Sequence, residues 1–414
     1  MHFRILHTFG NESFQEYFQL DIKLAARVKR VKPSPTLAVT AKANALRAQG
    51  KDIIGLGAGE PDFDTPEHIK QAAISAIKQG KTKYTPVDGT AELKQAIINK
   101  FEKDNGLSYT PEQILVSCGG KQSFYNLCQA LLNPGDEVII PAPYWVSYPD
   151  MVLLAGGEPV IVDGRMEQGF NISPEQLEAA ITDKTRLVVI NSPSNPTGRS
   201  YNRAELSGLA ETLRQHPDII IASDDMYEHI LWTEEAFHNI LNVCPGFYDR
   251  TVVMNGVSKA YSMTGWRIGY AAGPKDLIAA MKKIQSQSTS NPASISQAAA
   301  TEALSGDQSC IKEMLVEFKK RHDMVVARLQ DMEGVACLPS TGTFYSFPGF
   351  QAVIEASDKF NTDVELAEYL LEHAGVALVP GSAFGAPGHM RLSFATSMAL
   401  LTEALDRIAS ALDI

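Results

Sequence analysis

The sequence predicts an α/β protein: a large domain built on a mostly parallel, doubly wound sheet, followed by a smaller α+β domain. Three observations lead to this prediction. Short runs rich in valine and isoleucine alternate with amphipathic helical segments through most of the chain. These runs are apolar at successive positions, which is typical of strands covered on both faces. After about residue 330 the alternation gives way to short strand-like segments separated by glycines and prolines.

The first elements precede the main alternation. Residues 38–50 predict a helix that ends at Gly50, and residues 52–59 predict a short strand that runs into a loop. Residues 67–79 and 90–104 predict two amphipathic helices.

The main alternation begins with a strand and a glycine turn at residues 114–120, which lead into a helix over residues 121–132. The further strands of the sheet are expected at residues 136–143, 158–163, 186–193, 218–225, 250–257 and 268–273. Helices are expected between them at Pro174–Ile181 and Arg203–Arg214.

The smaller domain follows a long helical stretch over residues 291–329. Its strand segments are expected within residues 334–348, 375–384 and 389–395, with helices at 364–373 and 398–412. The expected organisation is an N-terminal extension at 1–20, disordered; a segment at 21–60 that packs with the small domain; the large domain at 61–300; and the small domain at 301–414.

Composition and charge narrow the classes of function. The 414 residues carry 37 basic and 48 acidic side chains, a net charge of −11, which argues against nucleic-acid and anionic-membrane partners. No apolar run approaches the roughly 20 residues of a membrane span, and residues 1–20 lack the apolar core of a secretory signal. Five scattered cysteines without CxxC spacing read as reduced thiols of a cytoplasmic protein and predict no metal site.

The segment from Gly256 to Gly269 contains the most informative pair of side chains. Lys259 follows small residues, as suits a lysine that must titrate easily and bond to an aldehyde. Arg267, eight residues on, offers a bidentate grip for a dianion. An aldehyde and a phosphate together indicate pyridoxal 5'-phosphate (PLP). The alternative is a surface lysine and arginine on either side of a tight turn.

Two loops supply further candidates for binding a flat, phosphorylated ring. Gly119, Gly120 and Lys121 open a helix, so their backbone N–H groups can face an anion, although the same pattern occurs in ordinary turns. Trp145 follows a strand end, where it can stack on a ring or simply fill the core.

Three more candidates follow strand ends. Asn195 lies in a proline-rich turn and offers an amide donor to a ring oxygen. Asp224 directly follows apolar strand residues, so it is expected to be buried and to need a cation such as a protonated pyridine nitrogen, unless it caps a helix starting near Asp225. Tyr227 can donate to the ring oxygen. Arg391 can clamp a substrate carboxylate or form a surface salt bridge.

Together these segments resemble the class I (fold-type I) PLP-dependent aminotransferases, most closely the bacterial aspartate aminotransferase subgroup that includes aspartate/prephenate enzymes. The resemblance extends from about Val28 to the C-terminus. It rests on KPSPTLAV, GAGEPDFDTPEHIK, KTKYTPVDGT, GGKQ, PAPYWVSYP, NSPSNPTG, SDDMYEH, GVSKAYSMTGWRIGY and RLSFATS.

The resemblance implies a role for each candidate. Lys259 is implied as the catalytic lysine that bonds to PLP, and Asp224 as the partner of the ring nitrogen. The implied cofactor-binding residues are Gly120, Lys121, Trp145, Asn195, Asp224, Tyr227, Lys259, Arg267 and, from a neighbouring subunit of a homodimer, Tyr84. The implied substrate-binding residues are Gly59, Trp145, Asn195 and Arg391, with Lys121 and Thr36 for a distal carboxylate and Lys32 for prephenate.

The resemblance implies transfer of the amino group of L-aspartate to 2-oxoglutarate, with prephenate as a further amino acceptor. An aromatic or other amino acid aminotransferase and a PLP-dependent lyase are the alternatives within this fold. A DNA-reading regulator of the same fold is disfavoured, because only about 30 residues precede the matching region. Gly256 departs from related enzymes, which often carry a phosphate-binding serine there, and Pro35 replaces a common alanine.

Overall fold

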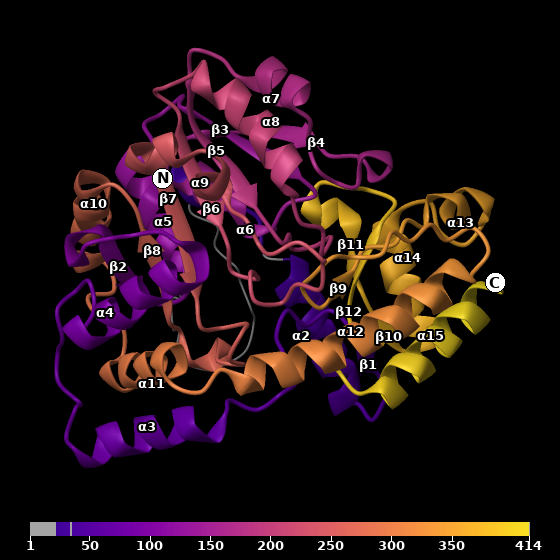
Figure 1. Ribbon diagram of the computed structural model, residues 1–414. Coiled ribbons are helices and arrows are strands. Elements are labelled where there is room, and N and C mark those ends of the chain that lie inside the picture. The colour runs from indigo at the N-terminus through magenta and orange to yellow at the C-terminus, as the bar shows by residue number, and fades with distance from the viewer. Residues whose placement is uncertain (1–21, 34, 414) are drawn as a thin grey trace, which may run out of the picture.

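The structure is a computed structural model that describes residues 22–33 and 35–413. The N-terminal extension expected at 1–20 lies outside the described residues. Figure 1 shows a large domain around one central sheet and a small domain beside it, with a long helix running from the first into the second.

The central sheet has seven strands in the order β2-β8-β7-β6-β5-β3-β4. Only β8 runs antiparallel to its neighbours, so the predicted mostly parallel sheet is confirmed. The strands are β2 (Ile114–Ser117), β3 (Glu137–Ala142), β4 (Glu158–Asp163), β5 (Thr185–Asn191), β6 (Ile220–Asp224), β7 (Thr251–Gly256) and β8 (Gly269–Ala272). Each falls within or beside a predicted apolar run.

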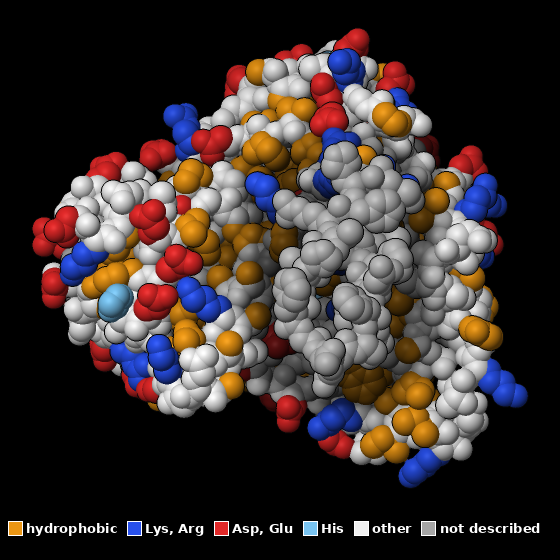
Figure 2. Space-filling model, turned by 180° about the vertical axis from the view of Figure 1, so that it is seen from behind, with side chains coloured by type: hydrophobic (Ala, Val, Ile, Leu, Met, Phe, Trp, Pro, Cys, Tyr) orange, Lys and Arg blue, Asp and Glu red, His pale blue; other side chains and the backbone are white. Residues whose placement is uncertain are grey.

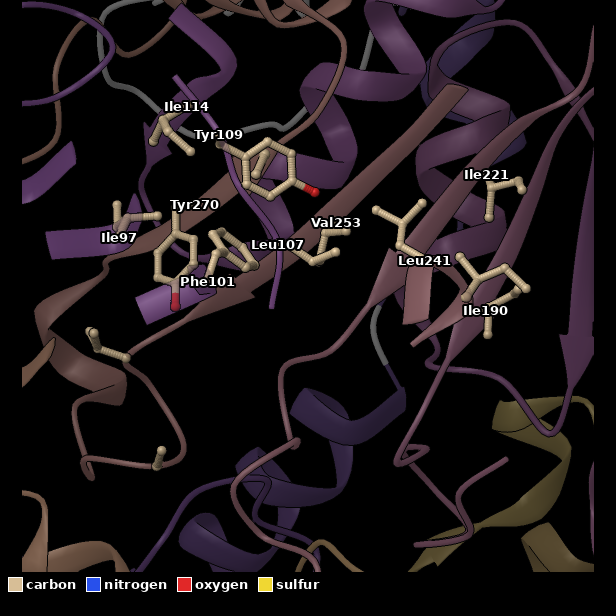
Figure 3. Close-up of a cluster of buried hydrophobic side chains, with 14 of the residues drawn as sticks. Ile97, Phe101, Leu107, Tyr109, Ile114, Ile190, Ile221, Leu241, Val253 and Tyr270 are labelled. Atoms are coloured by element: carbon tan, nitrogen blue, oxygen red, sulfur yellow. The ribbon is translucent and has the colours of Figure 1, made fainter. Parts of the chain in front are cut away.

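Helices cover both faces of this sheet because neighbouring strand residues point to opposite sides. Leu187 and Val189 pack with α5 (Gly120–Leu131), α6 (Ser147–Leu154) and α10 (Lys275–Ser286). Val188 and Ile190 face the other core, part of which is drawn in Figure 3. The helices of that second face are α3 (Glu67–Lys78), α4 (Ala91–Lys100), α7 (Pro174–Ala180), α8 (Arg203–Arg214), α9 (Ile240–Val243) and α11 (Ser294–Ser305).

The small domain contains the antiparallel sheet β11-β12-β9 and four helices around one core. Its strands are β9 (Tyr345–Ser346), β10 (Val376–Ala377), β11 (Val379–Pro380) and β12 (Met390–Ser393). Its helices are α12 (Ser309–Gln330), α13 (Gln351–Ala356), α14 (Asp363–Tyr369) and α15 (Met398–Leu412). The predicted helical stretch 291–329 is two helices rather than one, because the backbone turns extended at Gly306.

The N-terminal segment contacts both domains. Helix α1 (Ala26–Arg30) packs on α6 of the large domain. Helix α2 (Pro35–Ala48) contacts β10 and β11, and β1 (Ile54–Gly55) pairs in parallel with β10. The chain therefore begins in contact with the large domain and then joins the small one.

None of the helices in the described ranges is long and apolar enough to cross a membrane. Acidic and basic side chains intermix on the face seen in Figure 2. The parallel strands β5, β6 and β7 end at one edge of the sheet, and the loops after them meet there. This is the edge at which open α/β sheets bind their ligands.

Candidate active site

Lys259 lies just after β7, and its side chain turns toward the N-terminal segment. Its Nζ donates a hydrogen bond to the backbone oxygen of Gly59 at 2.5 Å. Nζ also lies 5.9 Å from the centres of the Tyr227 and Phe344 rings. Burial, aided by the positive charge of Arg391, lowers the pKa of Lys259 to about 8. A lysine in this state supplies a neutral amine near physiological pH, as bonding to an aldehyde requires.

Asp224 is the last residue of β6 and is half-buried. The carboxylate accepts hydrogen bonds from the Tyr148 hydroxyl and, at 3.3 Å, from the Met226 backbone N–H. Burial raises the pKa of Asp224. No helix begins at Asp225, because residues 226–229 form turns, so the capping alternative is excluded. Both hydrogen-bond donors are neutral, which leaves the carboxylate suited to a cationic partner.

Asn195 and Arg391 meet where the two domains face each other. Arg391 is only 2% exposed, and it donates from Nη1 to Oδ1 of Asn195 at 2.9 Å and from Nη2 to the Gly57 oxygen at 2.7 Å. Its Nε is buried and has no hydrogen-bond partner among the described residues. The surface salt bridge considered from the sequence is therefore excluded. A buried guanidinium whose partners here are neutral oxygens is suited to a carboxylate.

Asn191, at the end of β5, forms hydrogen bonds both to the loop that follows it and to the end of β6. Its Oδ1 accepts from the Asn195 backbone N–H at 3.0 Å, and its Nδ2 donates to the Asp224 backbone oxygen at 3.1 Å. One side chain thus fixes the Asn195 turn against the end of β6. This role was not predicted from the sequence, although Asn191 opens the proline-rich turn that contains Asn195.

Tyr227 projects from the turn after β6 toward the small domain. Its hydroxyl lies 3.1 Å from the hydroxyl of Tyr345 on β9. Both side chains are buried, and burial raises the pKa of each hydroxyl, so both remain protonated at neutral pH. Tyr345 was not predicted from the sequence, where it reads as one of several aromatic residues in a core segment.

Gly119, Gly120 and Arg267 form a cradle at the start of α5. A Cβ at Gly119 would lie 2.4 Å from the Arg267 guanidinium, and one at Gly269 would lie 2.3 Å from the Gly120 nitrogen. Arg267 donates to the backbone oxygens of Thr264 and Cys118 at 3.0 and 3.2 Å. It pairs with no carboxylate in the described part of the chain. A helix N-terminus beside such an arginine is a typical anion site.

Trp145 and Lys121 lie together at the edge of this cradle. The Lys121 Nζ lies 5.2 Å from the centre of the Trp145 ring, and that ring meets Tyr148 edge-on at 5.2 Å. Burial and the nearby Arg267 charge lower the pKa of Lys121. Tyr148 also donates a hydrogen bond to Asp224. Like Asn191, it was not assigned a role from the sequence.

Three predicted residues lie apart from this group. Tyr84 is 93% exposed. Lys32 is exposed on the rim of a cavity of about 540 Å³ between α2, α6 and α14, where its backbone N–H donates to Asp150 at 3.4 Å. Thr36 lies in the first turn of α2, and its hydroxyl has no partner among the described residues.

A buried polar cluster lies beneath the turn that carries Asp224 and Tyr227. Glu228 pairs with Lys100 of α4 and accepts from Asn105 at 2.7 Å and from Asn255 at 2.6 Å. The Lys100 charge and these donors hold the pKa of Glu228 low despite its burial. Asn255 belongs to β7, so the cluster connects this turn to the strand that leads to Lys259.

The residues present fit PLP. The Asp224 carboxylate, which has neutral partners, suits the protonated ring nitrogen, and the Gly120 and Arg267 cradle suits the phosphate. Lys259 supplies the amine for the aldehyde. Within residues 22–33 and 35–413, no group of histidine, cysteine or carboxylate side chains is arranged to hold a metal ion.

Comparison with known proteins identifies the family of the chain. Residues 51–408 match the family model described as aminotransferase class I and II. The chain is 60% identical to the aspartate/prephenate aminotransferase of Nitrosomonas europaea over 94% of this chain and 100% of that one. It is 57% identical to the enzyme of the same name from Cereibacter sphaeroides, over 93% and 97% of the two chains.

Solved structures show the same fold. The crystal structure of the aspartate aminotransferase from Rhizobium meliloti superposes with a TM-score of 0.91 at 50% identity, over 95% of this chain and 99% of that one. The Thermus thermophilus aspartate aminotransferase with maleate gives 0.88 at 46% identity, over 94% and 100%. The predicted fold-type I architecture is thereby confirmed, and the chain belongs to the aminotransferase class I and II family.

Proposed function

We propose that this protein is a PLP-dependent aspartate aminotransferase that moves the amino group of L-aspartate to 2-oxoglutarate, giving oxaloacetate and L-glutamate. The observation that carries the proposal is the half-buried Asp224 carboxyl group, which has neutral hydrogen-bond partners and lies at the end of β6, beside the strand that leads to Lys259. Such a group favours a pyridine ring that keeps its proton.

When bound, the cofactor supplies an aldehyde for the amino group and a ring that withdraws electrons from the substrate's α-carbon. Asp224 would keep the ring nitrogen charged, with Tyr148 holding the Asp224 carboxylate in place. Tyr227 and Asn195 would donate to the ring oxygen, and Trp145 would stack on the ring. The backbone N–H groups of Gly120 and Lys121, with Arg267, would hold the phosphate.

Lys259 moves the proton. Its low pKa would let Nζ take the proton from the α-carbon of the substrate and later give it back as an acid, and the Gly59 oxygen, which accepts a hydrogen bond from Nζ, would help to orient it. In each half of the reaction the Lys259 amine must first be neutral, to accept a proton, and then protonated, to donate one. A Lys259 pKa near the working pH therefore favours both the acceptance and the donation of the proton.

Arg391, Asn195 and Gly59 bind the α-carboxylate of the substrate. Two observations support this assignment: the Nε of Arg391 has no hydrogen-bond partner among the described residues, and its Nη1 donates to Oδ1 of Asn195 at 2.9 Å. Lys121, with Thr36, reads the distal carboxylate, which is consistent with the dicarboxylate maleate in the Thermus thermophilus relative. Arginine and lysine at the two ends of the site favour substrates with two carboxylates.

Prephenate is a second amino acceptor in this proposal, converted to arogenate. The relatives that are 60% and 57% identical carry the name aspartate/prephenate aminotransferase. Lys32, exposed at the rim of the cavity beside α2, is the proposed prephenate contact in this chain.

The proposed assembly is a cytoplasmic homodimer in which Tyr84 reaches the phosphate of the partner's site. The 93% exposure of Tyr84 within one chain supports this arrangement. Residues 61–300 form the cofactor-binding domain, and residues 301–414 with 21–60 form the part that closes over the substrate.

Purified protein loaded with PLP tests the proposal. Aspartate with 2-oxoglutarate should give oxaloacetate and glutamate, and prephenate with an amino donor should give arogenate; phenylalanine with 2-oxoglutarate measures the aromatic alternative. Lys259→Ala should abolish both turnover and the visible absorbance of bound PLP, because no amine remains to bond the aldehyde.

Lys283 is an exposed lysine on α10, and Lys283→Ala is the matched control. This variant should retain both the turnover and the visible absorbance of bound PLP. Wild-type turnover by Lys259→Ala would refute the assignment of Lys259. Release of ammonia or pyruvate without an acceptor would indicate a lyase.

A further inference from the structure

We infer that Tyr345 is a positioning residue that orients the Tyr227 hydroxyl toward the cofactor's ring oxygen; this inference rests on the proposed function. Neither the sequence motifs nor the resemblance singled out Tyr345. It belongs to the small domain, whereas Tyr227 belongs to the large one, so the contact between them crosses the domain boundary.

Tyr345 touches three parts of the proposed site. Its hydroxyl lies 3.1 Å from that of Tyr227, and the guanidinium carbon of Arg391 lies 4.6 Å from its ring centre. A Cβ added at Gly59 would stand 3.0 Å from the Tyr345 hydroxyl, tighter than most real contacts of that kind. The hydroxyl is therefore enclosed between Tyr227 and Gly59.

The backbone before Tyr345 is held by the large domain. Thr343 donates from its N–H to the Ile230 oxygen at 2.8 Å, and its hydroxyl accepts from the Tyr345 N–H at 3.2 Å. Gly342 pairs with Leu231 in an antiparallel bridge. Residues 230 and 231 follow Tyr227 by only a few positions, so the same short segment fixes both tyrosines relative to each other.

Either hydroxyl can donate in this contact, but a Tyr227 hydroxyl that donates to the ring oxygen leaves Tyr345 as the donor between the two tyrosines. Each hydroxyl has one proton, and Tyr227 is the only hydrogen-bond partner of the Tyr345 hydroxyl within the described chain. If Tyr345 donates to Tyr227, the Tyr227 proton is free to point at the ring oxygen. A donated hydrogen bond also polarises the Tyr227 hydroxyl and strengthens its onward bond.

Tyr345→Phe tests this role because it removes one oxygen and keeps the ring beneath Arg391. The readout is the pH at which the visible absorbance of bound PLP is half-changed, as a proton leaves the nitrogen next to the ring oxygen. A hydrogen bond donated to the ring oxygen makes that oxygen a weaker acceptor for the proton on the neighbouring nitrogen, so the proton leaves at lower pH. Weakening the hydrogen bond from Tyr227 should therefore raise the pH midpoint of the absorbance change. The expected rise is about 0.3 pH unit, since polarisation adds only a fraction of one hydrogen bond.

Tyr109→Phe is the matched control. Tyr109 is also a buried tyrosine, but its hydroxyl has no partner in the described structure, so its removal should leave the midpoint unchanged. Thermal melting of each variant reports whether the fold is kept.

A double-variant cycle decides whether Tyr345 acts through Tyr227. Tyr227→Phe alone should raise the midpoint further than Tyr345→Phe, and adding Tyr345→Phe to it should cause no further rise. An equal rise in both backgrounds, or none in the wild-type background, overturns the inference. A wild-type protein that shows no PLP-dependent absorbance would instead overturn the proposed function.

Discussion

At the scale of single residues, burial sets the chemistry of the site. Lys259, Asp224 and Arg391 are ionisable groups that burial pushes toward their uncharged forms. None of the three forms a direct ion pair with another protein side chain in the described structure. Groups held in this way are poised to gain partners from a ligand, which supports the proposal that they bind a cofactor and a substrate carboxylate.

The lowered pKa of Lys259 predicts how the cofactor-free protein reacts with PLP. Only the neutral amine attacks an aldehyde, so the rate of PLP incorporation should be low below pH 7 and should rise with a midpoint near pH 8. Stopped-flow absorbance across pH 6–10 measures the rate of PLP incorporation and its pH midpoint. Because the Arg391 charge is the second cause of the low pKa, Arg391→Leu should move this midpoint upward. A midpoint near that of an ordinary lysine in the wild type would contradict the prediction.

At the scale of elements, the site depends on close contact between neighbouring strands and α5. Gly256 ends β7 and pairs with Gly269 of β8, and Gly269 in turn touches Gly120 at the start of α5. Two glycines in register let the strand that leads to Lys259 approach the phosphate cradle. The departure noted at Gly256 therefore has a packing reason.

Gly256→Ser should lower stability without strengthening PLP binding. A Cβ there would lie 3.0 Å from the Ile268 oxygen and 3.1 Å from the Gly269 Cα, backbone atoms that cannot easily shift. The expected cost is about 1–3 kcal/mol in the free energy of unfolding, measured with urea.

Gly246→Ser is the control, because no atom lies within 4 Å of a Cβ there, and it should change stability by less than about 0.5 kcal/mol. Tighter PLP binding by a stable Gly256→Ser protein would show that a hydroxyl at this position reaches the phosphate.

At the scale of the whole molecule, the site lies between parts of the chain that are distant in sequence. Arg391 of the small domain bonds Asn195 of the large domain and Gly57 of the N-terminal segment. The proposed carboxylate binding at Arg391 would therefore involve all three parts. The homodimer remains a proposal, and Tyr84 offers its sharpest test.

Light scattering should give about twice the 45.1 kDa of one chain. In such a dimer, Tyr84→Phe should weaken PLP binding about tenfold, the effect of losing one hydrogen bond to a charged group. Equilibrium titration of the cofactor-free dimer measures this, and light scattering checks that the variant remains dimeric. Unchanged affinity in an intact dimer would remove Tyr84 from the phosphate site.

Local sequence was enough to predict the sheet, most of its helices and the identity of several site residues. Asn195, Asp224 and Lys259 follow apolar strands, and parallel strands end at one edge, so their proximity follows from the pattern. The helices α6, α9 and α10 were not predicted. Tyr148 and Tyr345 were also missed, because an aromatic residue beside core segments has the same local pattern whether it fills space or holds another side chain.

By itself, the sequence determined the fold class and the chemistry available at the strand ends, because apolar periodicity and residue type are local properties. Tertiary structure alone decided that Arg391 is buried against Asn195, that Asp224 bonds Tyr148, and that Tyr345 meets Tyr227 across the domains. The physical reason is that burial, the pKa shifts it causes and the choice of hydrogen-bond partner depend on segments far apart in the sequence, 334 residues in the case of Arg391 and Gly57, which come together only when the chain folds.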